Sequence, residues 1–151
     1  MIAGVDPDTK NIVVAKGARI LTASAKERTA ENRFRPLMKQ WREAVLPHLL
    51  DVDWVYIELP PMGVNPRATI NQALVVGAII YSLDVHKVGW SLVDPGTWKR
   101  LIIGNGRADK PLIKEWAVAN LGLADNLAQD FYDAAVIQRY GEVVSGSHIS
   151  S

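Results

Sequence analysis

Residues 2–25, IAGVDPDTKNIVVAKGARILTASA, decide the fold of this chain. Apolar segments at residues 2–6, 12–15 and 20–23 are separated by polar turns, a pattern typical of β-strands. Gly17-Ala18 suits a two-residue type II′ hairpin turn, because glycine tolerates the positive φ that the first position of this turn requires. The chain therefore opens with three predicted antiparallel strands.

Helix and strand patterns alternate along the rest of the chain. Residues 32–50 have the apolar period of a helix, although Pro36 obscures its start and Pro47 predicts a distorted last turn. Strands are predicted at 54–59 and 88–93, and further helices at 68–83, 111–121 and 129–140. This order predicts an α/β protein with a ribonuclease H-like fold, a five-stranded mixed sheet with helices on both faces. One domain is expected over residues 1–144, followed by a flexible tail at 145–151.

Composition excludes several classes of protein. The chain has 151 residues, 48% of them hydrophobic and 22% charged, which fits one globular domain with a packed core. It has no cysteine, which excludes disulfides, zinc–thiolate sites and cysteine nucleophiles and suits a cytoplasmic protein. The N-terminus has no secretory pattern, and the longest apolar run, residues 73–81, is far shorter than the ~20 residues that span a bilayer, so no membrane association is expected.

Charge is distributed unevenly, although the net charge is only +1. Residues 16–42 contain eight basic side chains and two acidic ones, whereas residues 117–142 contain four acids and one arginine. A basic face and an acidic pole are therefore predicted on one small domain.

Four acids stand where hydrophobic residues would be expected. Asp6 and Glu58 end predicted strands, while Asp130 and Asp133 share one face of the last helix with Ala134, Ile137 and Gly141. Two carboxylates 4 Å apart repel by roughly 4 kcal/mol, a penalty that divalent cations remove. Oxygen ligands without cysteine or histidine favour Mg²⁺ or Mn²⁺, and two such ions can support phosphodiester hydrolysis. Taken singly, each acid could instead be a turn cap, an edge charge or a helix N-terminal acid.

Four segments in order, IAGVDPDTKN, VYIELPPMGVN, VDPGTWKRLIIGNGRADKPLI and QDFYDAAVI, resemble the RuvC-type Holliday-junction resolvases. These are dimeric ribonuclease H-fold endonucleases of bacteria and their phages, and the resemblance extends over residues 2–140. It implies two Mg²⁺ ions per active site, replaceable by Mn²⁺, bound by Asp6, Glu58, Asp130 and Asp133. It also implies a catalytic role for Lys110, which would contact the DNA near the cleaved bond.

The resemblance implies a crossover junction endodeoxyribonuclease that resolves Holliday junctions and other branched DNA by paired nicks, leaving 5′-phosphates. The GNGRADK loop and its neighbours Lys99, Arg100, Arg107, Lys110 and Lys114 are expected to contact DNA phosphates. Helix 68–83 is apolar on nearly every face, and the family pairs two protomers through this helix, so a homodimer is expected.

Two departures from the bacterial pattern stand out. Asp8 replaces the usual glycine and adds a fifth acid near the metal site, while Pro60, Pro61 and Met62 follow the strand glutamate where an aromatic residue often stands. These departures and the short C-terminus resemble the phage members, which would place the protein in the cytoplasm of a host cell.

Other functions stay open at this stage. The chain could be a ribonuclease H-fold nuclease that acts on RNA–DNA hybrids or flap DNA, or a non-catalytic protein that binds branched DNA. Actin-like ATPases also begin with a similar glycine-aspartate motif, but they need two such domains around the nucleotide.

Overall fold

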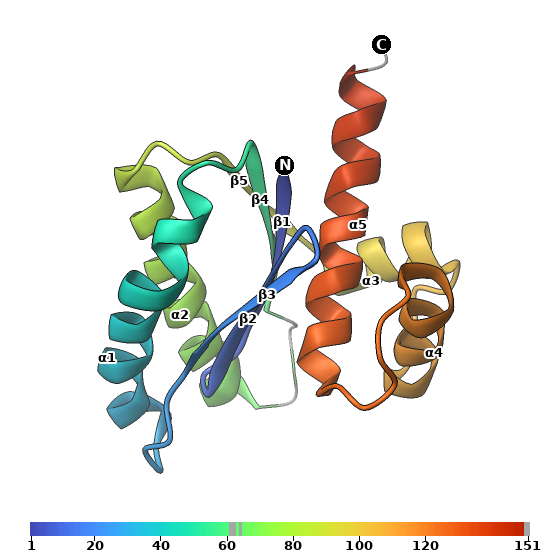
Figure 1. The fold of residues 1–151 in the computed structure, drawn as a ribbon. Coiled ribbons are helices and arrows are strands. Elements are labelled where there is room, and N and C mark those ends of the chain that lie inside the picture. Colours follow the sequence, from blue (N-terminus) through green and yellow to red (C-terminus); the bar gives the residue numbers. More distant parts are fainter. Residues whose placement is uncertain (61–62, 64, 150–151) are drawn as a thin grey trace.

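The computed structural model describes residues 1–60, 63 and 65–149. It contains a five-stranded sheet in the order β3-β2-β1-β4-β5 (Figure 1). The strands are β1 (Ile2–Pro7), β2 (Asn11–Lys16), β3 (Arg19–Ser24), β4 (Trp54–Glu58) and β5 (Trp90–Val93). The first three strands pair antiparallel, whereas β4 runs parallel to β1 and β5 parallel to β4. The predicted mixed sheet is confirmed.

The predicted hairpin turn joins β2 to β3. Lys16 pairs with Arg19, so Gly17 and Ala18 form a two-residue loop. Gly17 has a φ of 60°, whereas Ala18 has no positive φ, as a type II′ turn requires.

Helices and shorter helical turns make up the rest of the regular structure. They are α1 (Ala30–Gln40), α2 (Pro66–Val85), α3 (Pro95–Trp98), α4 (Lys110–Leu121) and α5 (Gln129–Ile149). After α1 the chain continues as a π-helical turn (Trp41–Val45) and a 3₁₀ turn (Leu46–Leu49). Pro47 lies in this 3₁₀ turn, which confirms the predicted distortion. A second π-helical turn, Lys99–Ile103, follows α3 and was not expected from the sequence.

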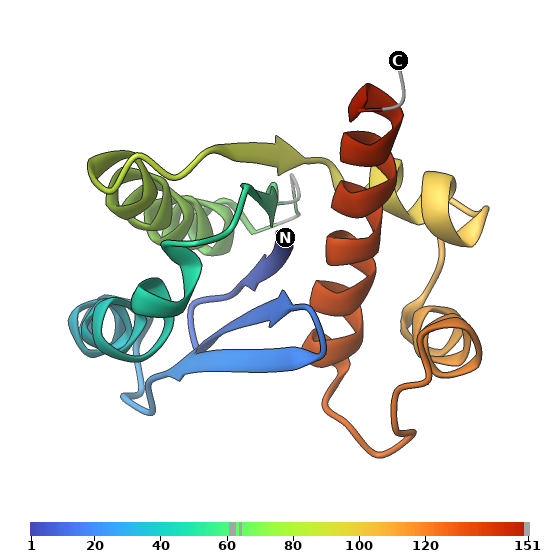
Figure 2. The ribbon, with the colours of Figure 1, turned by 45° about the horizontal axis from the view of Figure 1, so that its top comes forward.

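Helices cover both faces of the sheet, as predicted (Figure 2). Helices α1 and α2 pack on one face, where Val5, Ile57, Trp41 and Leu83 belong to one buried cluster. Helices α4 and α5 lie over the other face. Because each face is covered, the central strand β1 is buried along most of its length, and its carboxyl end lies between the two helix layers.

Helix α5 lies directly against the sheet because glycines allow it. A Cβ atom on Gly4 of β1 would come within 2.3 Å of the backbone nitrogen of Gln138, and one on Gly141 within 2.4 Å of the Tyr56 ring. This close approach places the first turn of α5 over the carboxyl end of β1.

Helix α5 continues to Ile149, so the predicted helix end near Tyr140 is wrong, while the flexibility of residues 145–151 stays a prediction. Tertiary packing explains the extension. Gly141 packs against Tyr56, and the Tyr56 hydroxyl lies 3.0 Å from the hydroxyl of Ser145.

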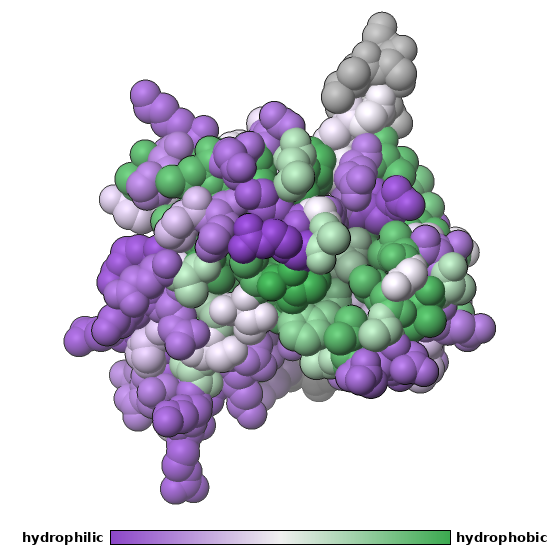
Figure 3. Space-filling model, in the orientation of Figure 1, coloured by the Kyte–Doolittle hydropathy of each residue, from purple (hydrophilic) through white to green (hydrophobic). Residues whose placement is uncertain are grey.

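The predicted basic face is smaller than the sequence indicates. Lys16 and Arg33 are buried. Lys16 donates to Asp51 and to the His48 carbonyl, each at 2.7 Å. Arg33 donates to the carbonyls of Thr9, Glu27 and Arg28 and so ties the loop after β1 to the segment before α1. Hydrophilic side chains still cover the region of α1 on the face shown in Figure 3.

Helix α2 has two apolar sides. Val75, Val76, Ile79 and Leu83 are buried. On the opposite side an apolar strip is exposed, consisting of Ile70, Leu74, Gly77, Tyr81 and Val85. Among the described residues, α2 is the one helix whose length and composition would suffice to cross a membrane.

Candidate active site

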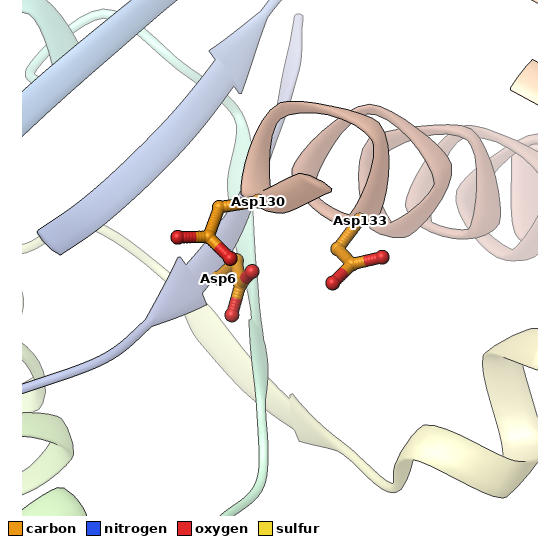
Figure 4. A group of neighbouring side chains, drawn as sticks. All are labelled: Asp6, Asp130 and Asp133. Atoms are coloured by element: carbon orange, nitrogen blue, oxygen red, sulfur yellow. The ribbon is translucent and has the colours of Figure 1, made fainter. Parts of the chain in front are cut away.

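Three carboxylates meet at the carboxyl end of β1 (Figure 4). One oxygen each of Asp6, Asp130 and Asp133 lies within 4.8 Å of the others. Asp6 lies in β1 and is 7% exposed, while Asp130 and Asp133 come from the first turns of α5. The structure therefore brings together three of the four predicted metal ligands, with Asp6 far in the sequence from the other two.

The start of α5 orients the two helix carboxylates. Asp130 and Asp133 lie three residues apart and so point from one side of the helix toward β1. The side-chain amide of Gln129 donates to Asp133 Oδ1 at 3.1 Å and restricts the rotamer of this carboxylate. Sequence reasoning had not singled out Gln129.

The fourth predicted ligand, Glu58, lies beside the three aspartates but outside the 4.8 Å group. It ends β4, next to β1 in the sheet, and its charge raises the pKa of Asp6. Its carboxylate accepts a hydrogen bond from the indole nitrogen of Trp98 at 2.8 Å. Trp98 is buried, and its contact with the acids was not predicted from the sequence.

Burial and mutual repulsion disfavour the negative charges of the four carboxylates, so a bound cation would stabilise the cluster. Burial, and then repulsion by the neighbouring acids, raises the pKa of Asp6 well above its ordinary value. Burial raises the pKa of Glu58 to about 7, against the opposing effect of the Trp98 hydrogen bond. The pKa values of Asp130 and Asp133 are also raised, chiefly by burial. Cations bound among the four carboxylates would therefore stabilise their charged forms.

The donor set fits Mg²⁺ or Mn²⁺. All four side chains offer carboxylate oxygens, the ligands that these hard ions prefer, and none offers sulfur or imidazole. Opposite ligands of a Mg²⁺ ion lie about 4 Å apart, so small side-chain rotations would bring the three aspartates into one coordination sphere.

Two lysines border the acids. Burial keeps the pKa values of Glu58, Asp130 and Asp133 raised, but the charge of Lys110 opposes this rise at Asp130 and Asp133, and that of Lys99 opposes it at Glu58 and Asp133. Lys110 is the exposed first residue of α4, directly after the N-cap Asp109. Both lysines thus act electrostatically on the acid cluster.

The other predicted DNA contacts lie on the same segment of the chain. Arg100 and Arg107 are exposed, and Lys114 lies one helical turn after Lys110. Asp8 raises the pKa of Asp6 and Asp130, so the fifth acid does lie near the cluster. Pro61 and Met62, which replace the expected aromatic residue, lie outside the described residues.

A polar recess that sequence reasoning missed lies where Asp8 approaches the start of α2. It has a volume of about 260 Å³, and its lining includes Asp8, Arg33, Asn65 and Arg67. Arg67 is exposed and adds a cation to this side of the molecule. Because Arg67 follows a proline at a helix start, its signal in the sequence was that of an ordinary helix N-terminus.

No family model and no curated protein matches the sequence. Several solved structures match in three dimensions, among them two of RuvC. Thermus thermophilus RuvC in complex with a Holliday junction substrate has a TM-score of 0.72 and 20% identity, with 91% of this chain and 89% of that chain covered. A second Thermus thermophilus RuvC structure has a TM-score of 0.69 and 20% identity, with 91% and 90% covered. This similarity confirms the ribonuclease H-like fold and the structural resemblance to RuvC.

Proposed function

We propose that this chain is a metal-dependent endodeoxyribonuclease that resolves Holliday junctions and other branched DNA. The acid cluster of Asp6, Asp130 and Asp133, with Glu58 beside it, carries this proposal. The fold supports it, because one of the similar RuvC structures was solved with a Holliday junction substrate.

Each residue of the cluster has a distinct proposed role. Asp6 is the most buried of the acids and lies among the other three, so it would be the central ligand for Mg²⁺ bound at the site. Glu58, Asp130 and Asp133 complete the ligand set. The bound ions would activate a water and stabilise charge on the cleaved phosphodiester. Lys99 and Lys110 would bind the phosphate, and the products would carry 5′-phosphates.

Paired nicks require two active sites, and the apolar strip of α2 supports a homodimer. Its five residues recur every three or four positions and so form one continuous stripe along the helix. Tyr81 is 72% exposed, and the side chains of Ile70, Leu74 and Val85 are each more than half exposed. A second copy of the chain would cover this stripe and set the two sites on opposite strands of a junction. The proposed location is the cytoplasm, that of a host cell if the protein is phage-encoded.

The decisive experiment compares labelled four-way, Y-shaped, flap, linear duplex and RNA–DNA hybrid substrates with Mg²⁺, Mn²⁺ or EDTA. We expect symmetric nicks near the branch point with either ion, none in EDTA, and products that a ligase can reseal. If linear duplex is cut as well as the four-way junction, the protein is a nuclease but not a junction resolvase. Preferred cutting of the hybrid would assign ribonuclease H activity, and binding without cutting would assign a DNA-binding protein.

A further inference from the structure

We propose that Trp98 is a positioning residue for Glu58, whose carboxylate it holds by one oxygen so that the other is free to ligate a metal ion. The inference rests on the proposed function, because it concerns the same site. Trp98 lies outside the acid cluster and would orient one of its ligands, Glu58, before a metal ion binds.

The sheet brings this pair of residues together across 40 positions of sequence. Glu58 and Val93 are register partners at the ends of β4 and β5, and the amide of Leu59 donates to the Val93 carbonyl at 2.8 Å. Helix α3 begins two residues after Val93, with Asp94 as its N-cap. One turn of helix then carries Trp98 back over Glu58, and the Nε1–Oε2 distance is 2.8 Å.

The indole is held rigidly, so its N–H points in a fixed direction. Trp98 is 1% exposed and belongs to the buried cluster that also contains Ile113, Tyr132 and Val136. The ammonium of Lys99 lies 5.4 Å from the centre of the Trp98 ring. A locked donor restricts the carboxylate it binds, and the loss of side-chain entropy on metal binding is then smaller.

The chemistry of an indole suits this role. A buried indole N–H needs an acceptor, and that of Trp41 finds one in the Ser82 hydroxyl at 2.9 Å. The indole of Trp98 instead uses a carboxylate of the acid cluster. An indole is a neutral group with one donor and no acceptor, so it orients Glu58 without adding a positive charge that would repel cations.

The test compares Trp98→Phe with Trp41→Phe. Each variant loses one buried indole N–H and keeps an aromatic ring, but Trp41 contacts Ser82 and lies away from the acids. Mn²⁺ binding is measured without DNA by isothermal titration calorimetry, and the Mg²⁺ concentration for half-maximal junction cleavage is measured separately. We expect Trp98→Phe to weaken Mn²⁺ binding about 10-fold and to raise the Mg²⁺ requirement, with cleavage recovering at high Mg²⁺. Trp41→Phe should change neither.

Unchanged Mn²⁺ affinity in Trp98→Phe, or a wild type that binds no Mn²⁺, would overturn the inference. If wild type binds Mn²⁺ more tightly than Trp98→Phe yet cuts no branched DNA, the proposed function fails and the positioning role stands. Should Trp98→Phe not fold, the wild type labelled with ¹⁵N at its indoles answers the question. Mg²⁺ should shift the Trp98 indole signal and leave that of Trp41 in place, whereas an unmoved Trp98 signal would refute the role.

Discussion

Replacing Glu58 by glutamine should stabilise the metal-free protein at pH 8 while abolishing cleavage. Burial raises the pKa of Glu58 from its ordinary value of 4.5 to about 7. Between these two pH values the folded protein keeps the Glu58 proton and the unfolded chain has lost it. The free energy of unfolding therefore falls as the pH rises from 4.5 to about 7. Above that pH, Glu58 causes no further fall.

The size of this effect follows from the pKa values. One pKa unit corresponds to about 1.4 kcal/mol, so the ionised Glu58 costs the folded state about 3 kcal/mol at pH 8. Glutamine has nearly the same shape, bears no charge, and its amide oxygen can still accept from Trp98. For a domain of 151 residues, a gain of this order corresponds to a melting temperature about 6 to 12 °C higher.

Thermal unfolding in EDTA, followed by circular dichroism at pH 5 and pH 8, measures the effect. The two proteins should differ little at pH 5, where most of the Glu58 penalty is absent, and the variant should melt higher at pH 8. Mg²⁺ should raise the melting temperature of wild type at pH 8 more than that of the variant. Glu115→Gln, at an exposed position of α4, is the matched control and should have little effect. A variant no more stable than wild type at pH 8 would refute the reasoning.

Three further substitutions test the site and the dimer. Asp6→Asn should abolish cleavage but bind junctions as tightly as wild type or more tightly in a gel-shift assay, because a negative charge near phosphates is removed; retained cleavage would contradict its role. Lys110→Ala should slow cleavage and reduce the salt dependence of binding by about one ion, with little change in melting temperature because the residue is exposed. A large loss of stability would instead make Lys110 a structural residue. Gly77→Glu should give a folded monomer by sedimentation, since a Cβ at Gly77 meets no atom within 4 Å; a wild type that is monomeric at micromolar concentration would refute the dimer.

Local patterns were sufficient for most of the fold. The three opening strands, the hairpin at Gly17 and the helices on both faces follow from apolar periodicity and turn chemistry, which depend on neighbouring residues. The shared face of Asp130 and Asp133 follows from the helical repeat alone. Element ends were less predictable, because α5 continues to Ile149 through contacts with Tyr56, which lies far away in the sequence.

The burial of charged residues could not be predicted from local sequence either. Lys16 and Arg33 look like surface cations in the sequence, yet each is buried by partners that the fold supplies. The partners of Lys16 lie 32 and 35 residues away, and the Thr9 carbonyl that accepts from Arg33 lies 24 residues away. Composition and local charge counts contain no information about such distant acceptors, so the basic face was overestimated.

The sequence by itself determined the order of the five strands and of the helices other than α3, and the positions of the acids at their ends, because both depend on local periodicity and on where apolar runs stop. Only the tertiary structure decided how the carboxylates are arranged, with three aspartates within 4.8 Å and Glu58 held to one side. It also decided that Trp98 donates to Glu58, since the register of β4 against β5 sets which side chain meets that carboxylate. Such a contact joins residues far apart in the chain, and packing alone selects it.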